Sequence, residues 1–204
     1  MPFPKLTAKT FASIRELNGI SQRTQEEHYE LYKGYVAKTN EIQEKLSAVD
    51  RSTANQIYSD LRALRVDLSF AIGGVKNHEI YFGHLGGKGG APSGKVAELI
   101  ARDFPGVDAW LSDFKASGLA ARGWVWLAYD HDWGTLTTAV GDAQNTFPLW
   151  NATPVLALDV YEHAYWLDYG RLRAKYIEAF FNNLDWGVVE QNLERALAIS
   201  AAHK

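Results

Sequence analysis

The feature that most constrains this chain is an apolar run that ends in an acid and a histidine. Val155-Leu156-Ala157-Leu158 predicts a buried strand, and Asp159-Val160-Tyr161-Glu162-His163-Ala164-Tyr165 follows it and opens a helical stretch. An Asp at the strand end and a His in the first helical turn can both point into one site. This spacing is typical of a metal or catalytic centre, although D-x3-H alone also recurs by chance. The rest of the chain must supply the partners.

The composition limits which ions such a site can hold. The 204 residues contain no cysteine, which excludes disulfides, zinc ribbons, iron–sulfur clusters and thiol catalysis. Any metal must therefore be held by His, Asp and Glu, which suit manganese, non-haem iron or zinc. The net charge of −3 and the lack of a Lys/Arg block give no indication of a nucleic-acid partner.

The distribution of apolar residues gives no indication of a membrane. No segment approaches the roughly 20 apolar residues that a transmembrane helix needs, and no apolar run follows a basic start. We therefore expect a cytoplasmic protein with no membrane partner.

The first half of the sequence predicts an antiparallel helical hairpin. Helical periodicity runs from Ser21 to about Val49, and a second helix is expected from Ser52 or Thr53 to about Phe82. The glycine-rich stretch 86–92 marks a boundary between lobes. We therefore predict two domains, with the helical hairpin in 1–87 and a C-terminal α/β domain in 88–204.

The second half mixes helical and strand periods. Three β-rich runs predict a small three-stranded antiparallel sheet, and the polar 130–132 between the first two indicates a hairpin turn. The fold class is therefore α+β. The expected strands are 123–129, 135–140 and 155–158, and the expected helices are 93–103, 107–116, 160–183 and 186–201.

Two of the six histidines differ from the others in context. His28 and His78 lie on the two long predicted helices among apolar and aromatic neighbours, whereas His84, His131 and His203 fall in loops or the tail. Two buried imidazoles that face one another need a shared partner, either a metal ion or a hydrogen bond between them. With Asp159 and His163 they form a three-histidine, one-carboxylate set that suits redox-active manganese or iron. A hydrolytic zinc site remains open from the ligand types alone.

Several motifs, taken in order, resemble the iron/manganese superoxide dismutase family over nearly the whole chain. They are His28-Tyr29, Asn77-His78, Gly89-Gly90-Ala91-Pro92-Ser93-Gly94, Gly123-Trp124-Val125-Trp126-Leu127 and Asp159 through Tyr165, with Arg173 and Tyr176 after them. The last motif, DVYEHAY, matches the D-V-W-E-H-A-Y of the family closely.

The resemblance implies an enzyme that converts superoxide to dioxygen and hydrogen peroxide by a one-electron redox cycle. One manganese or iron ion per subunit would be held by His28, His78, Asp159 and His163. A Gln tunes the ion in this family, from the second helix in iron-type members and from the sheet region in manganese-type members. This chain has Gly74 at the first place and Gln144 at the second, which favours manganese.

The first predicted helix departs from the family pattern. The family has His-x3-His-x3-Tyr, whereas this chain has Tyr32 in place of the second His and Tyr35 one residue early. Loss of one residue rotates a helix by about 100°, unless the family helix carries a π-type bulge that the loss removes. His28, Tyr32 and Tyr35 then share one face. We predict Tyr35 as the phenol at the substrate entrance and Tyr32 as a new residue behind the ligands, with both in catalytic roles.

Other residues are predicted to support the ion and a subunit interface. In the family, the Glu at Glu162 bonds the ligand His of a partner subunit, so a homodimer or a tetramer is expected. Tyr161 stands where the family has a Trp, and Trp166 where it has a Tyr. We predict that Trp166 contacts the partner subunit's Tyr32. The predicted supporting set is Glu162, Trp126, Tyr161, Trp166 and Arg173.

A second class of function remains open from the sequence. The chain could be a superoxide-dismutase-like, metal-binding scaffold without catalysis, since Tyr32, Tyr161 and Trp166 all differ from the family pattern. Retention of the four ligands, Gln144 and Glu162 favours the enzyme, because a scaffold needs none of them.

Overall fold

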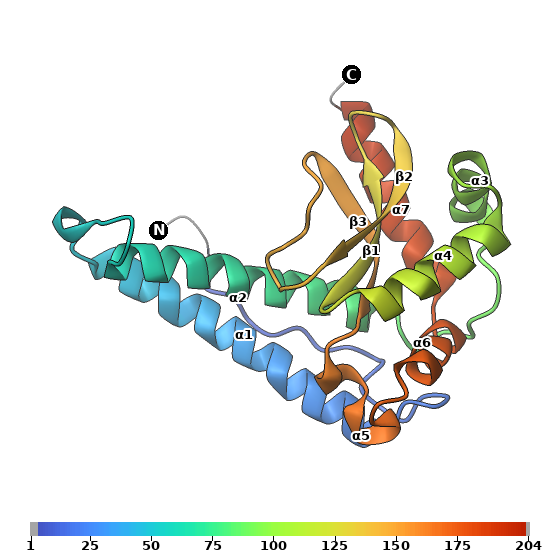
Figure 1. Ribbon diagram of the computed structural model, residues 1–204, viewed down its shortest axis with the longest axis horizontal. Helices are drawn as coiled ribbons and strands as arrows, with labels where there is room; N and C mark the ends of the chain where they lie inside the picture. The colour runs from blue at the N-terminus through green and yellow to red at the C-terminus, as the bar shows by residue number, and fades with distance from the viewer. Residues whose placement is uncertain (1–3, 203–204) are drawn as a thin grey trace.

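The computed structural model describes residues 4–202, and His203 lies outside them. The N-terminal half is a long antiparallel pair of helices, α1 (Gln22–Ala48) and α2 (Asp60–Gly83), as Figure 1 shows. Ser21 caps α1, because its hydroxyl accepts the N–H of Thr24. A small apolar cluster joins the far ends of the two helices and consists of Ile42, Leu46, Leu68 and Ala71.

The second long helix begins later than the sequence predicted. Residues 51–53 form only a 3-10 turn, η1 (Arg51–Thr53), and α2 starts at Asp60. The side chain of Ser59 accepts the N–H of Arg62, whereas Ser52 bonds to Asp50. The predicted start at Ser52 or Thr53 is therefore wrong, because a similar capping residue seven positions on begins the helix.

The C-terminal half carries a three-stranded antiparallel sheet in the order β2-β1-β3, which confirms the predicted α+β class. The strands are β1 (Trp124–Asp130), β2 (Thr135–Gly141) and β3 (Ala152–Asp159). The central strand β1 is buried along its whole length. Its register places Trp124 opposite Asp159 on one side and Gly141 on the other. The strand end that carries Asp159 therefore lies beside a buried indole.

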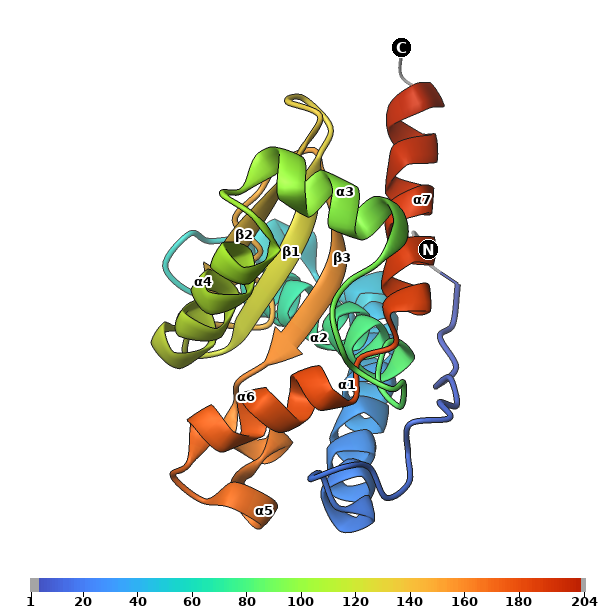
Figure 2. The same ribbon diagram turned by 90° about the vertical axis from the view of Figure 1, so that its right-hand side faces the viewer.

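Helices cover the sheet. Figure 2 shows α3 (Gly94–Asp103) and α4 (Val107–Ala120) over one face, while α7 (Trp186–Ala202) and α2 pack against β3. His84, the residue that directly follows α2, is fully buried, and its Nε2 accepts the N–H of Ala157 at 3.1 Å. This bond ties the end of the hairpin to the edge of the sheet.

The predicted helix over 160–183 is broken into three pieces: η2 (Glu162–Ala164), α5 (Trp166–Tyr169) and α6 (Arg173–Asn182). Gly170 ends α5 with a φ of 50°, a left-handed conformation that glycine adopts without a steric penalty. The break allows the chain to turn back after β3, so η2 approaches α1. None of the described helices is long and apolar enough to span a membrane.

Candidate metal centre

Four side chains from distant parts of the sequence meet between the hairpin and the sheet. His28 comes from α1, His78 from α2, Asp159 from the end of β3 and His163 from η2. The Nε2 atoms of the three histidines lie 3.2, 3.6 and 3.1 Å from Asp159 Oδ2, in the order His28, His78 and His163. Three of the four residues are buried, and His163 is partly exposed. The structure thus brings the predicted ligand set together.

The turn after β3 directs the side chains of Asp159 and His163 into the same cluster. The backbone N–H of Tyr161 donates to Asp159 Oδ1 at 2.9 Å, which fixes the carboxylate and leaves Oδ2 facing the histidines. The hydroxyl of Tyr176 contacts the backbone oxygen of Asp159 at 2.7 Å. Hydrogen bonds from the protein therefore hold Oδ1 and the backbone oxygen of Asp159, while Oδ2 faces the three histidines.

The backbone of α2 fixes the tautomer of one imidazole. His78 Nδ1 lies 2.6 Å from the carbonyl oxygen of Gly74, which can only accept, so the proton is on Nδ1 and Nε2 carries a lone pair. This Nε2 is buried and has no hydrogen-bond partner among residues 4–202. A buried lone pair directed at a carboxylate fits a metal ion, since neutral imidazole is a common ligand of manganese and iron.

Burial sets the charge state of these groups. Burial lowers the pKa of His78 from 6.5 to about 3, and it also lowers the pKa of His28 although the hydrogen bond with Asp159 opposes the change. For Asp159, burial would raise the pKa, but the charge and hydrogen bond of His163 and those of His28 outweigh it and leave the pKa below its ordinary value. A carboxylate beside the neutral imidazoles of His28 and His78 is a charge pattern that can bind a cation.

Gln144 lies in the loop between β2 and β3, and its amide bridges two aromatic residues at the site. Its Oε1 accepts the indole N–H of Trp124 at 3.0 Å, and its Nε2 donates to the hydroxyl of Tyr35 at 3.2 Å. The Tyr35 ring lies 5.4 Å from the ring of His78. The structure therefore places Gln144 and Tyr35 beside the ligands.

Two adjacent glycines in α2 make this arrangement possible. A Cβ on Gly73 would lie 2.0 Å from the backbone oxygen of Gln144, and a Cβ on Gly74 would lie 2.6 Å from the ring of Tyr35. Neither contact is sterically allowed. The loop of Gln144 and the ring of Tyr35 therefore both depend on the missing side chains of this pair.

Tyr32 shares the face of α1 with His28 but its hydroxyl turns elsewhere. Helix α1 is regular α-helix through this region, and the Tyr32 side chain is fully buried. Its hydroxyl accepts the N–H of Lys9 at 3.0 Å and donates to Glu79 Oε1 at 3.1 Å. The hydroxyl thus joins the N-terminal segment, at Lys9, to α2, at Glu79. Contact with a partner subunit's Trp166 would require Tyr32 to leave this buried position.

A buried polar side chain next to His78 was not assigned a role from the sequence. Asn77 Nδ2 donates to the backbone oxygen of Gln144 at 3.0 Å, and Asn77 Oδ1 accepts the indole N–H of Trp126 at 3.1 Å. Asn77 therefore connects the loop of Gln144 to the central strand. The signal in the sequence was a polar residue on the buried face of a helix, directly before a predicted ligand.

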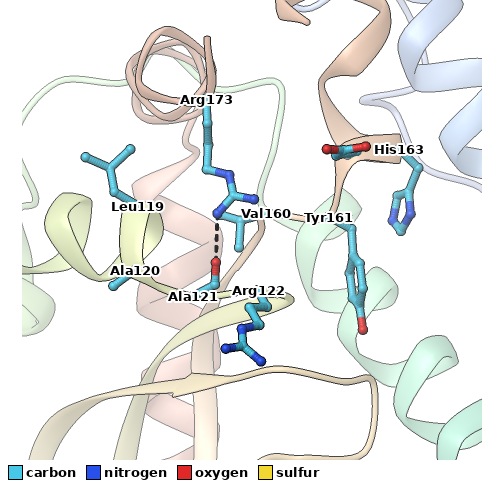
Figure 3. Close-up of a pocket in the computed structure, with 9 residues that line it drawn as sticks. Leu119, Ala120, Ala121, Arg122, Val160, Tyr161, His163 and Arg173 are labelled. Carbon is cyan, nitrogen blue, oxygen red and sulfur yellow. Dashed lines mark hydrogen bonds between the residues drawn. The ribbon is translucent and has the colours of Figure 1, made fainter. Parts of the chain in front are cut away.

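Three further predicted residues, Tyr161, Glu162 and Arg173, line a hollow beside His163 (Figure 3). The ring of Tyr161 stacks on the ring of His163 with centroids 5.2 Å apart, and its hydroxyl donates to the backbone oxygen of Asp142 at 3.3 Å. Arg173 crosses the hollow and donates to the Ala121 oxygen at 2.7 Å and to the Tyr165 hydroxyl. Glu162 lines the same hollow, and Trp166, the first residue of α5, is about half exposed.

The comparison with known proteins agrees with this geometry. Residues 17–86 match the iron/manganese superoxide dismutases, alpha-hairpin domain, and residues 92–192 match the C-terminal domain of the same family. The chain therefore belongs to the iron/manganese superoxide dismutase family.

Similar curated proteins carry either metal in their names. "Superoxide dismutase [Fe]" of Aquifex pyrophilus is 45% identical, with 98% of this chain and 96% of the relative covered. The protein of the same name from Aquifex aeolicus is 44% identical with the same coverage. "Superoxide dismutase [Mn] 2" of Haloferax volcanii is 34% identical over 88% of this chain and 90% of its own length.

Proposed function

We propose that this chain catalyses the dismutation of superoxide at one manganese or iron ion held by His28, His78, Asp159 and His163. The observation that carries the proposal is the convergence of three imidazole Nε2 atoms on Asp159 Oδ2 at 3.1 to 3.6 Å. Membership of the family and the names of the relatives support the same activity.

When bound, the ion would supply the one-electron chemistry by alternating between its trivalent and divalent states. The backbone holds two of the ligands in place: the carbonyl of Gly74 accepts from His78 Nδ1, and the N–H of Tyr161 donates to Asp159 Oδ1. Tyr35 accepts the N–H of Gln144, which leaves its own hydroxyl hydrogen free to donate. Burial raises the pKa of Tyr35, so the phenol keeps that proton in neutral solution.

Manganese is the ion that we favour. Gln144 supplies the amide at the site from the loop between β2 and β3, while position 74 is a glycine. This arrangement corresponds to the manganese type in the family pattern. The two Aquifex relatives are named as iron enzymes and the Haloferax relative as a manganese enzyme, so metal content has to be measured directly.

We also propose that the hollow of Figure 3 is covered by a second copy of this chain. Glu162 and the partly exposed His163 both line it, and a ligand histidine is oriented well when its second nitrogen donates to a carboxylate. Leu119, which lines the hollow, is about half exposed, as are Trp166 and Leu167 of α5, and apolar side chains of this kind are covered in subunit interfaces. A homodimer is expected, and a cytoplasmic location remains our prediction.

The activity is tested by reconstituting the metal-free protein separately with manganese and with iron. Bound metal and the rate of superoxide loss are measured in each sample, with Asp159→Ala as the inactive variant and His131→Ala, in the turn after β1, as the matched control. Fast superoxide loss with manganese and little with iron is the expected result. Full metal occupancy with no superoxide loss in either sample would favour the scaffold without catalysis.

A further inference from the structure

The segment before α1 forms no helix or strand over residues 4–11, yet it is bonded to the hairpin and runs beside it, as the dark blue trace of Figure 2 shows. Asn40 of α1 binds this segment twice: its Oδ1 accepts the N–H of Leu6 at 2.8 Å, and its Nδ2 donates to the Leu6 oxygen at 2.9 Å. The side chains of Leu6 and Ala8 pack against the core. The segment is therefore a structured part of the wall around the hairpin.

The backbone of Lys9 holds α1 close to a ligand. The oxygen of Lys9 accepts the hydroxyl of Tyr29 at 2.9 Å, and its N–H donates to the hydroxyl of Tyr32 at 3.0 Å. Tyr29 directly follows the ligand His28 in the helix, and Tyr32 lies about one turn beyond His28. The segment is therefore attached to α1 beside the first of the four ligands.

The side chain of Lys9 holds α2 close to a second ligand. Its ammonium pairs with the carboxylate of Glu79, which directly follows the ligand His78 in the helix. The other oxygen of that carboxylate accepts the hydroxyl of Tyr32 at 3.1 Å. Lys9 therefore joins α1, through its backbone, to α2, through its side chain, next to the ligands that the two helices carry.

An aromatic ring of the segment packs behind the same two ligands. The Phe11 ring lies 5.4 Å from the Phe82 ring, centroid to centroid. The Phe82 ring in turn lies 4.9 Å from the ring of His28 and 6.1 Å from the ring of His78. Ser13 is buried, and its hydroxyl donates to the backbone oxygen of Phe82 at 2.8 Å. Movement of the segment away from the hairpin would therefore remove support from the wall behind both imidazoles.

The ligands must separate before an ion can pass between them, because three of the four are buried. We propose that residues 6–13 form a clamp across the hairpin, and that release of this clamp opens the route by which the ion enters and leaves the site. The bonds of the clamp at Lys9 and Leu6 are exposed or only partly buried, and local opening starts in segments held by contacts of this kind. The inference rests on the proposed function, because it concerns the same ion.

The test measures two rates: loss of the ion from the manganese-loaded protein to excess EDTA, and uptake of manganese by the metal-free protein. Lys9→Met removes the ion pair with Glu79 and keeps the apolar stem. Both rates should rise together, by roughly twofold to fivefold, the factor that the loss of an exposed ion pair supplies. The Kd for manganese should stay unchanged, because the clamp acts on a barrier that entry and exit share. Phe11→Ala should raise both rates further, and Lys9→Arg, which keeps the pair, should behave as the wild type.

Lys38→Met is the matched control. Lys38 also forms an exposed ion pair, with Glu41, but that pair lies within α1 and joins no second element. It should leave both rates unchanged. Wild-type rates in both Lys9→Met and Phe11→Ala would overturn the inference, and so would faster loss without faster uptake, because the segment would then only support the bound state. A wild-type protein that binds no ion would overturn the proposed function as well, whereas full ion binding without superoxide loss would overturn the proposed function alone.

Discussion

The ring of Tyr35 occupies the space that a side chain at Gly74 would need, with ring atoms 2.6 Å from the position of the missing Cβ. The same Gly74 gives its carbonyl oxygen to His78 Nδ1. One residue of α2 therefore orients a metal ligand through its backbone and admits the entrance phenol through its lack of a side chain.

Gly74→Ala should displace Tyr35 and lower both stability and activity. Alanine gains about 1 kcal/mol of helix propensity over glycine, but overpacking of this kind typically costs about 1 to 3 kcal/mol and moves the ring away from Gln144. Thermal unfolding and superoxide loss measure the two effects. Gly34→Ala in α1 is the control, because a Cβ there meets nothing within 4 Å; it should be neutral or stabilising. Equal stability in the two variants would contradict the steric argument.

Removal of the hydroxyl should affect mainly stability at Tyr32 and mainly activity at Tyr35. Tyr32→Phe loses the bonds to Lys9 and Glu79 and should cost about 1 to 3 kcal/mol of stability, with activity close to wild type. Tyr35→Phe removes one bond, from Gln144, so it should cost less stability than Tyr32→Phe but lower kcat/KM by roughly tenfold or more, because the phenol delivers protons. Denaturant unfolding and steady-state kinetics of both variants check this. The reverse pattern would make Tyr32 the catalytic phenol.

Gln144→Leu should destabilise the protein by about 1 to 3 kcal/mol, because it leaves the buried N–H of Trp124 without an acceptor. It also removes the donor to Tyr35, so superoxide loss should fall in the manganese-loaded protein. Asn145→Leu is the control, because the side chain of Asn145, the next residue in the loop, bonds only the exposed Ser69. A Gln144→Leu variant with wild-type stability would mean that Trp124 finds another acceptor.

The metal-free protein should become less stable as the pH is lowered, partly because of His84. Burial lowers the pKa of His84 from 6.5 to about 3. As the pH is lowered, the His84 imidazole is therefore protonated in the unfolded state before it is protonated in the folded state. The folded state keeps its full advantage above pH 6.5 and loses about 1.4 kcal/mol per pH unit below it, until about pH 3. His84→Gln keeps an acceptor for Ala157 but does not titrate. Between pH 6.5 and 5 the wild type should lose about 2 kcal/mol more than the variant in urea unfolding; equal losses would contradict this.

The ligand set could be predicted because each ligand stands in a strong local pattern. Asp159 and His163 follow an apolar strand at fixed spacing, and His28 and His78 interrupt apolar helix faces. The pairing of β1 with β3 then places Asp159 beside Trp124. Such patterns survive in sequence because strand and helix periods dictate which way a side chain points.

Other features depend on contacts that a local pattern does not contain. The start of α2 was predicted wrongly at Ser52 or Thr53, because serine and threonine are both good capping residues by type and the sequence does not show that Ser59 is the one that caps the helix. The break after β3 depends on Gly170, whose left-handed conformation is visible only in the structure. Gln25 resembles any polar residue of a helix in the sequence, and its complete burial is visible only in the structure.

The bond between His84 and Ala157 has a further consequence for how the protein behaves at high concentration. Strand β3 lies at the edge of the sheet, and the unpaired amides of an edge strand are a template on which another chain can add a strand. Here the Ala157 amide is already engaged by an imidazole, and Pro154 in the same strand has no amide hydrogen to offer. This edge is therefore a poor starting point for aggregation, and the residue that protects it is the one whose protonation in acid would release it.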